Sequence, residues 1–182
     1  MGLRVTVHEP TAADAEELVS AVHASRELHA AWVSAPATFE GYATHLARCR
    51  GDAFAGHLLR DRADGALVGV VDLSRITRGS LQSADVGYYG LVGGTGRGLL
   101  TEGVGLVVAR AFAVVGLHRV EASIQPSNGR SLALIRGLGF RREGHSPRAL
   151  HVAGAWRDHE RWALLADEPA AAALVSRLRR AG

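Results

Sequence analysis

The sequence predicts an α/β (α+β) protein with a mixed, mostly antiparallel sheet of six to seven strands and helices on both faces. The chain has 182 residues, 47% of them hydrophobic, which is enough for one core. Hairpin-like strand patterns fill its first half, and helical patterns link strands in its second half. No repeat or linker divides it, so we expect one domain over 1–182, with a core of about 3–166 and a tail helix of about 168–181.

The first half predicts one strand, two helices and three further strands. Apolar alternation indicates the strands, and Asp64-Gly65 is typical of the tight turn in a hairpin. Thr11 and Asp14 resemble a capping box before an apolar helical pattern, and Thr38 precedes the second helix. The expected ranges are strand 3–9, helix 11–27, helix 39–50, and strands 53–61, 66–76 and 83–92.

The second half alternates helices with strands, as crossover connections require. One long apolar helical pattern follows a glycine-rich loop directly, and a shorter one is closed by glycines. The overall order is β-α-α-β-β-β-α-β-α-β-β before the tail helix, with one of the two late strands at 159–166. The other expected ranges are helix 99–116, strand 118–125 and helix 131–140.

Composition excludes several classes of site. All 21 basic residues are arginines, and the absence of lysine excludes Schiff-base chemistry and a Walker-type phosphate loop. Cys49 is the only cysteine, so no intramolecular disulfide or cysteine cage can form, and no histidine spacing predicts a metal site. The net charge of +3 with scattered arginines argues against nucleic-acid binding. With no membrane-spanning run or signal pattern, we expect a cytoplasmic protein without a membrane anchor.

The stretch GGTGRGLLTEGV (93–104) indicates an anion site, because glycines allow close approach to the amides that open a helix. A P-loop motif is absent, and the dinucleotide fingerprint lacks its third glycine. A pyrophosphate held by backbone amides, as in coenzyme A, remains. The alternative is a simple strand-to-helix turn.

The segments SADVGYYGLV, TGRGLLTEGV and HRVEASIQPSNGRSLALIRGLGFRREG together resemble the GNAT superfamily of acetyl-CoA-dependent N-acyltransferases. The similarity is closest to the branch with the RimJ/RimL-type ribosomal-protein N-terminal acetyltransferases. It follows the order of elements over 3–166 and is most specific over 83–144. In the phosphate motif [QR]xxGx[GA], Gly98 matches the central glycine, whereas Thr95 and Leu100 depart from the pattern.

The resemblance implies a sheet that is splayed between its fourth and fifth strands, with the pantetheine arm of acetyl-CoA in the gap. The backbone of Gly90, Leu91 and Val92 would pair with this arm, and one amide there would stabilise the oxyanion. Arg97 would add a charge-assisted bond to a phosphate. The implied cofactor-binding residues are Leu91, Val92, Gly93, Thr95, Gly96, Arg97, Gly98, Leu99, Leu100, Thr101 and Asn128, with no metal.

The resemblance also implies direct attack of a neutral amine on the thioester, which needs a proton acceptor and a proton donor. Asp85 stands where related sequences often have Glu, and we expect it to be the general base, although a surface carboxylate is an equal alternative. Ser131 matches a serine that protonates or binds the thiol; the alternative is a helix-capping hydroxyl. Asn128 bonds to pantetheine or the helix start, or is a turn residue.

The expected acceptor-binding residues are Trp32, Tyr88 and Tyr89. Trp32 lies in a loop before the second helix, where an aromatic side chain either recognises a ligand or packs on the core. The two tyrosines should face opposite sides of their strand, so that one lines the cleft and the other packs. Carboxylates that could hold the incoming cation, or could simply be solvated, are Glu27, Asp158 and Glu160.

The sequence therefore predicts an acetyl-CoA-dependent N-acetyltransferase that acts on a primary amine. Protein N-terminal amines are the first expectation, and a small amine such as an antibiotic is the second. A non-catalytic acyl-CoA-binding module is an alternative of another class. A homodimer is expected by analogy with the fold alone.

Overall fold

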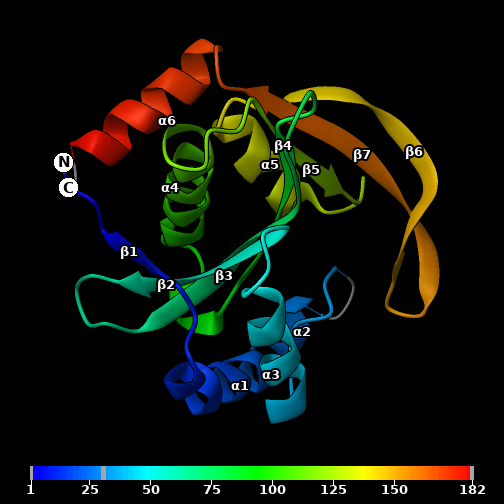
Figure 1. Cartoon of the computed structure of the whole chain (residues 1–182). Helices are drawn as coiled ribbons and strands as arrows, with labels where there is room; N and C mark the ends of the chain where they lie inside the picture. The colour runs from blue at the N-terminus through cyan, green and yellow to red at the C-terminus, as the bar shows by residue number, and fades with distance from the viewer. Residues whose placement is uncertain (1, 30–31, 181–182) are drawn as a thin grey trace.

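A computed structural model describes residues 2–29 and 32–180. Its strands form one twisted sheet in the order β1-β2-β3-β4-β5-β7-β6 (Figure 1). All neighbours are antiparallel except β4 and β5, which are parallel. The expected mixed, mostly antiparallel sheet is therefore confirmed. The strands are β1 (Val5–His8), β2 (Phe54–Asp61), β3 (Leu67–Thr77), β4 (Ser83–Gly90), β5 (Arg119–Ile124), β6 (Arg141–Val152) and β7 (Ala155–Leu165).

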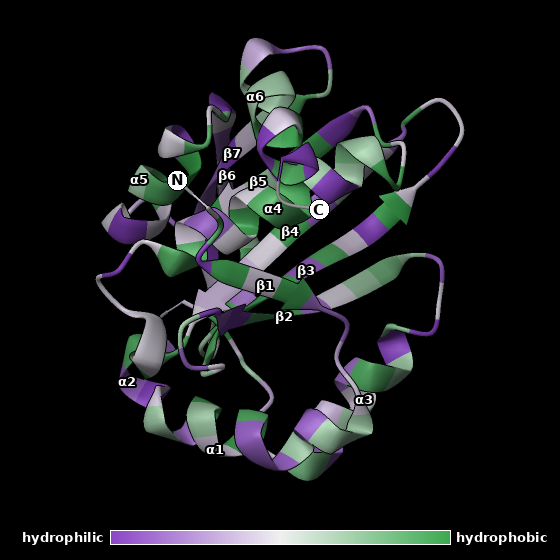
Figure 2. Cartoon of the chain, turned by 90° about the vertical axis from the view of Figure 1, so that its left-hand side faces the viewer, coloured by the Kyte–Doolittle hydropathy of each residue, from purple (hydrophilic) through white to green (hydrophobic). Residues whose placement is uncertain are grey.

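Helices cover both faces of the sheet (Figures 1 and 2). One face carries α1, α2 and α3 over a core cluster that includes Leu18, Tyr42 and Leu58. The other face carries α4, α5 and α6 over a larger cluster that includes Val107 and Ile135. The helices are α1 (Ala15–Ala24), α2 (Arg26–His29), α3 (Phe39–Arg48), α4 (Leu99–Ala113), α5 (Gly129–Gly137) and α6 (Pro169–Arg179), with 3-10 turns η1 (Ala12–Asp14) and η2 (Val92–Gly94).

The sheet opens between its fourth and fifth strands. Pairing between β4 and β5 comprises only three residue pairs, from Ser83 with Arg119 to Asp85 with Glu121. Beyond this point the two strands diverge, while β4 stays paired with β3 as far as Gly90. The backbone edge of β4 from Val86 to Gly90 therefore faces an opening in the sheet, as the expected splay requires.

The helix expected over 11–27 is interrupted at Ser25, so that α1 ends at Ala24 and α2 is a separate turn. The Ser25 hydroxyl donates to the carbonyl of Ala21 and accepts the backbone N–H of Val92, at 2.7 and 3.0 Å. A serine that bonds to the preceding turn competes with regular helix. The expected long helix is wrong here because Ser25 binds the segment after β4.

The late strands form a longer hairpin than the sequence indicated. β7 begins at Ala155, four residues before the expected start, and β6 precedes it. The hairpin extends well beyond the other strands (Figure 1). Helix α6 packs on α4 through Ala171 and Leu174, both buried, and the expected last residue of this tail helix lies outside the described residues. In the described ranges no helix is long and apolar enough to cross a membrane.

Close packing of α4 on the sheet depends on Gly103. A Cβ added at Gly103 would lie only 3.0 Å from Cγ of Leu59, and it would overlap the side chain of this fully buried residue. We expect Gly103→Ala to lower the free energy of unfolding by about 1–3 kcal/mol, because overpacking outweighs the better helix propensity of alanine. Gly137→Ala is the control, since an added Cβ there meets no atom within 4 Å. Urea denaturation compares the two; equal stability would contradict this packing.

Candidate functional site

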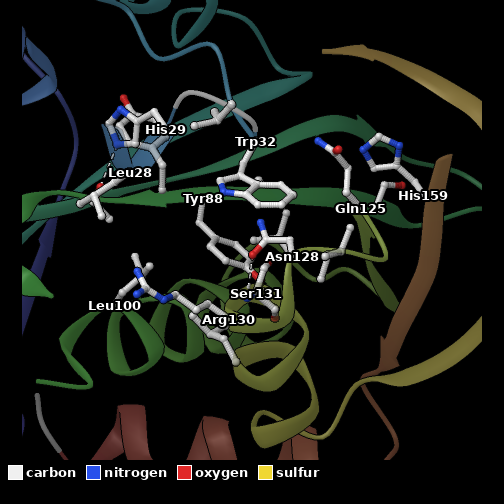
Figure 3. Close-up of a pocket in the computed structure, with 18 of the residues that line it drawn as sticks. Leu28, His29, Trp32, Tyr88, Leu100, Gln125, Asn128, Arg130, Ser131 and His159 are labelled. Atoms are coloured by element: carbon white, nitrogen blue, oxygen red, sulfur yellow. Dashed lines mark hydrogen bonds between the residues drawn. The ribbon is translucent and has the colours of Figure 1, made fainter. Parts of the chain in front are cut away.

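A cavity of about 320 Å³ lies where β4 and β5 separate. Its walls come from α2, the loop after it, the two diverging strands, the start of α5 and β7 (Figure 3). The Trp32 indole projects into the cavity towards Tyr88 and Asn128. The lining residues include seven that the sequence predicts as site residues: Trp32, Tyr88, Tyr89, Thr95, Leu100, Asn128 and Ser131.

The start of α5 places a hydroxyl pair on one wall. Asn128 is the N-cap of α5, and its Oδ1 accepts the backbone N–H of Ser131 at 3.1 Å. The Ser131 hydroxyl is thereby not needed as the cap, and it lies 2.7 Å from the Tyr88 hydroxyl. Burial raises the pKa of Tyr88 to about 12, so this phenol is protonated at neutral pH. Asn128 rather than the Ser131 hydroxyl therefore caps α5, and the Ser131 hydroxyl forms a pair with the Tyr88 hydroxyl that faces the cavity.

The glycine loop between η2 and α4 has the geometry of an anion site. Gly96 and Gly98 have φ of +74° and +73°, in the left-handed region that favours glycine. Gly98 is the N-cap of α4, and the amides of Leu99, Leu100 and Thr101 have no partner within the helix. A helix N-terminus with such amides attracts phosphate. The loop is exposed at Gly93, Thr95 and Gly96.

Arg97 does not extend from this loop as a free cation. Its guanidinium pairs with Asp61 at 2.6 Å, and Asp61 is buried at the end of β2. The backbone N–H of Ala63 and the charge of Arg97 lower the pKa of Asp61. Arg4 approaches the same loop and donates to the Arg97 carbonyl at 3.0 Å. The expected phosphate contact of Arg97 is thus occupied by an internal carboxylate, and Arg4 is the second cation beside the loop.

The backbone groups that face the gap belong to Tyr88 and Gly90, whereas Gly90, Leu91 and Val92 were expected. The N–H of Leu91 donates to Val68 on β3, and that of Val92 donates to Ser25. Because backbone groups alternate sides along a strand, Gly90 and Tyr88 present theirs to the gap. The Gly90 carbonyl accepts His29 Nε2 there, at 2.9 Å.

Asp85 lies outside this cavity. It lines a second cavity of about 670 Å³ on the face of α3, together with Arg48, Ser74 and Gly87. Its carboxylate pairs with Arg75 Nε at 2.5 Å. The general-base role of Asp85 stays a prediction, which its place outside the first cavity and its ion pair with Arg75 do not favour.

The predicted acceptor residues divide between the two faces of β4. Tyr88 packs towards α5 and Tyr89 towards α2, as strand alternation predicts, and both line the cavity. The three carboxylates considered for the cation lie elsewhere: Glu27 is exposed, Asp158 contacts His145 and the Arg148 amide, and Glu160 pairs with Arg142. None of them lines the cavity.

Comparison with known proteins gives the family. The family model for the acetyltransferase (GNAT) domain matches residues 4–141. The chain belongs to the GNAT acetyltransferase family. A Bacillus subtilis protein named "Probable N-acetyltransferase YjcK" is 40% identical over 103 residues, 57% of each chain. The Escherichia coli ribosomal protein uS5-alanine N-acetyltransferase is 33% identical over 56% of this chain and 52% of its own. The chain thus aligns with only about half the length of these curated relatives.

Solved structures give the same fold for this GNAT domain. Mycobacterium smegmatis RimJ in complex with CoA-disulfide has a TM-score of 0.84 at 28% identity, covering 94% of this chain and 88% of that chain. Spermidine N-acetyltransferase from Vibrio cholerae, in complex with CoA and spermine, has a TM-score of 0.76 at 19% identity, covering 89% and 95%. The latter likeness shows the fold alone.

The cavity also contains groups that the sequence did not predict. His29 is buried, bonds to Gly90 and lies edge-on to the Tyr89 ring at 5.1 Å. His159 and Arg130 also line the cavity. Asp72 lines neither cavity; it is a charge within the apolar strand LVGVVDL, a pattern that could have indicated a buried carboxylate. Histidines and arginines scattered along the chain carry no comparable pattern.

Three buried polar atoms lack hydrogen-bond partners beside the site: His45 Nε2, Asp72 Oδ1 and the Tyr89 hydroxyl oxygen. His45 Nε2 lies 3.7 Å from Asp72 Oδ1. Burial raises the pKa of Asp72 to about 7 and lowers that of His45. Both groups are therefore held towards their neutral forms. Among the described residues no cluster of three or more histidine, cysteine or acidic side chains could hold a metal ion.

Asp72 makes stability depend on pH in a defined direction. Its folded-state pKa lies above the ordinary 3.8, so the native state keeps a proton that the unfolded chain loses. Wild-type stability is thus lost as pH rises from about 4 through about 7. We expect Asp72→Asn to remove this loss and to gain about 2–4 kcal/mol relative to wild type between pH 4 and pH 8. Thermal unfolding at both pH values measures it.

Asp158→Asn is the matched control, because hydrogen bonding from the Arg148 amide lowers the pKa of Asp158. Its stabilisation is present above the unfolded pKa of 3.8 and is lost only as pH falls below that value, so Asp158→Asn should show no comparable gain between pH 4 and pH 8. A pH-independent effect of Asp72→Asn would contradict the burial of its carboxylate.

Proposed function

We propose that this chain transfers an acetyl group from acetyl-CoA to a primary amine, with the N-terminal amine of a protein as acceptor. The observation that carries the proposal is the opening between β4 and β5, which joins the N-terminus of α4 to a cavity with a serine–tyrosine pair. Family membership and the relatives named as N-acetyltransferases support it.

The residues present fit coenzyme A. Its pyrophosphate would lie on the loop of Gly96 and Gly98 and on the first amides of α4, whose dipole favours an anion. The arm would follow the gap-facing edge of β4, where Tyr88 and Gly90 present backbone groups. When bound, this co-substrate supplies the activated acetyl group as a thioester.

The chain's own groups would serve the reaction in two ways. A gap-facing backbone N–H would stabilise the developing oxyanion, a contribution of about 3 kcal/mol. Ser131 would donate the proton that the leaving sulfur needs, with the Tyr88 phenol 2.7 Å away to donate to Ser131 in turn. Asp85 as general base belongs to the same proposal, with the Arg75 contact weighing against it.

The cavity lining supports a protein N-terminus over a polyamine. None of the described lining residues is an aspartate or glutamate, whereas Arg130 is one of them. A polycation would have no carboxylate to replace its lost hydration. The relative named for ribosomal protein uS5-alanine acetylation supports a protein acceptor. A small-molecule amine is the alternative substrate, and a non-catalytic acyl-CoA-binding module is the alternative class.

The direct test combines calorimetric titration with acetyl-CoA and a thiol-release assay over N-terminal peptides and small amines. Binding with turnover on peptides supports the proposal. Turnover on small amines alone favours the alternative substrate, and binding without turnover on either favours the binding module. Absence of binding would overturn the proposal. The proposed function also includes a homodimer and a cytoplasmic location.

Loop geometry gives a testable effect on coenzyme A affinity. Gly98→Ala forces alanine into the left-handed region and moves the start of α4. We expect the dissociation constant for coenzyme A to rise about tenfold, with about 1 kcal/mol of lost stability. Gly79→Ala is matched, because Gly79 has φ of +67° in a loop that lines neither cavity. Gly79→Ala should lose similar stability and keep its affinity for coenzyme A. An equal loss of coenzyme A affinity in the two variants would refute the site.

The hydroxyl pair gives a second test. We expect Ser131→Ala to lower kcat by about 10²-fold, with coenzyme A affinity within twofold, because the lost group acts on the leaving sulfur. Folding should be preserved, since Asn128 caps α5 through the backbone of residue 131. Tyr88→Phe should show a smaller loss. Steady-state kinetics and single-turnover rates measure both, and wild-type kcat in Ser131→Ala would exclude the role.

A further inference from the structure

The two cavities adjoin where the sheet opens. Three residues line both of them: Val86 and Gly87 on β4, and Ser123 on β5. All three lie just past the last β4–β5 pair, Asp85 with Glu121. Gly87 and Ser123 are exposed, and a Cβ added at Gly87 would meet no atom within 4 Å. Both cavities therefore share the opening, and Gly87 leaves room for an extended chain to pass from one to the other.

A β-bulge directs Arg75 into the second cavity. Ser74 pairs with Asp85, and the register between β3 and β4 shifts after Ser74. In a regular strand the next side chain, Arg75, would project from the opposite face to Asp85. Arg75 instead has φ of +51°, in the left-handed region, and its Nε donates to Asp85 at 2.5 Å. Backbone strain in a non-glycine residue is typical of functional positions, and this one holds a guanidinium at the cavity.

Arg48 is a second cation at this cavity, and it has no carboxylate partner. It ends α3, and its Cζ lies 3.9 Å from the centroid of the Phe54 ring, which also lines the cavity. Stacking on a ring holds an arginine in place and leaves the N–H groups at the edge of its plane available. No acidic side chain of the described residues forms an ion pair with Arg48.

The second cavity therefore has an excess of positive charge. Its described lining holds two guanidinium groups, Arg48 and Arg75, and one carboxylate, Asp85, which is already paired with Arg75. An acidic side chain that entered would exchange its hydration for charge-assisted N–H···O bonds. A basic side chain would meet cations with no free carboxylate beside them.

We propose that the second cavity binds an acidic side chain of the acceptor protein, shortly after its N-terminal residue, with Arg48 as the recognising cation. The proposal rests on the proposed function. The N-terminal amine lies in the first cavity, the chain crosses the opening at Gly87, and a glutamate or aspartate reaches Arg48. An extended acceptor that runs beside β4 from Gly90 to Asp85 would need about six residues. The acidic residue therefore lies within the first six positions of the acceptor.

A panel of peptides tests this charge preference. Each peptide begins with alanine, ends in an amide and carries Glu, Gln or Lys at one position from the second to the sixth, with all other residues neutral. We expect kcat/KM for Glu to exceed that for Gln about tenfold at one or two positions, chiefly through KM. High salt should reduce this ratio, because it screens exposed charges. A ratio below twofold at every position would overturn the proposal.

Reversing the charge of Arg48 should reverse the preference. We expect the Glu-to-Gln ratio of kcat/KM to fall to about one in Arg48→Gln, and Lys to be preferred over Glu in Arg48→Glu. Comparing peptides within one variant cancels any change in its folded fraction. Arg50→Glu is the matched control, because Arg50 is exposed just after α3 and lines neither cavity. Equal shifts in Arg48→Glu and Arg50→Glu would show an effect of overall charge and would overturn the site.

The outcomes separate the two levels of inference. If wild type releases no thiol with any peptide or small amine, the proposed function fails. If it acetylates small amines alone, the protein acceptor fails, and the role of the second cavity fails with it. If it acetylates the peptides but all variants keep the wild-type ratios, only the role of Arg48 and the second cavity fails.

Discussion

The early end of pairing between β4 and β5 is the constraint on which this site depends. Three residue pairs hold the strands together, and beyond Asp85 the β4 edge has no neighbouring strand. An unpaired edge within a sheet is normally costly, because its backbone groups need partners. Here one partner is His29, which bonds to Gly90. The proposed binding of coenzyme A uses the rest of this edge, with which the extended arm would pair as a strand does.

Two layers of helices keep this opening in shape. On one side, the break between α1 and α2 lets Ser25 bind the amide of Val92, so the end of β4 is held by the helices over that face. On the other side, α4 packs closely on the sheet at Gly103, and Asn128 fixes the start of α5. The glycine loop lies between these supports, with its conformation set by left-handed glycines and by the Arg97–Asp61 pair.

Charge is distributed unevenly around the opening. The cavity lining holds Arg130 and two histidines but no described carboxylate, whereas Asp85 lines the second cavity on the α3 side and Asp72 lies near His45 on the same face of the sheet. Of the two carboxylates, Asp85 forms an ion pair with Arg75 at 2.5 Å, whereas burial raises the pKa of Asp72 to about 7.

The sequence by itself determined most of the strand and helix order, the Asp64-Gly65 hairpin turn and the family, because alternation, glycine spacing and caps are local signals. It could not determine which side chains are paired: Arg97 with Asp61 and Tyr88 with Ser131 join residues far apart in the chain, and Asp85 with Arg75 joins two adjacent strands. Proton affinity, free charge and access to the gap depend on those pairings and on burial. Only the tertiary structure decided them, since each requires strands and helices to be packed before the contact exists.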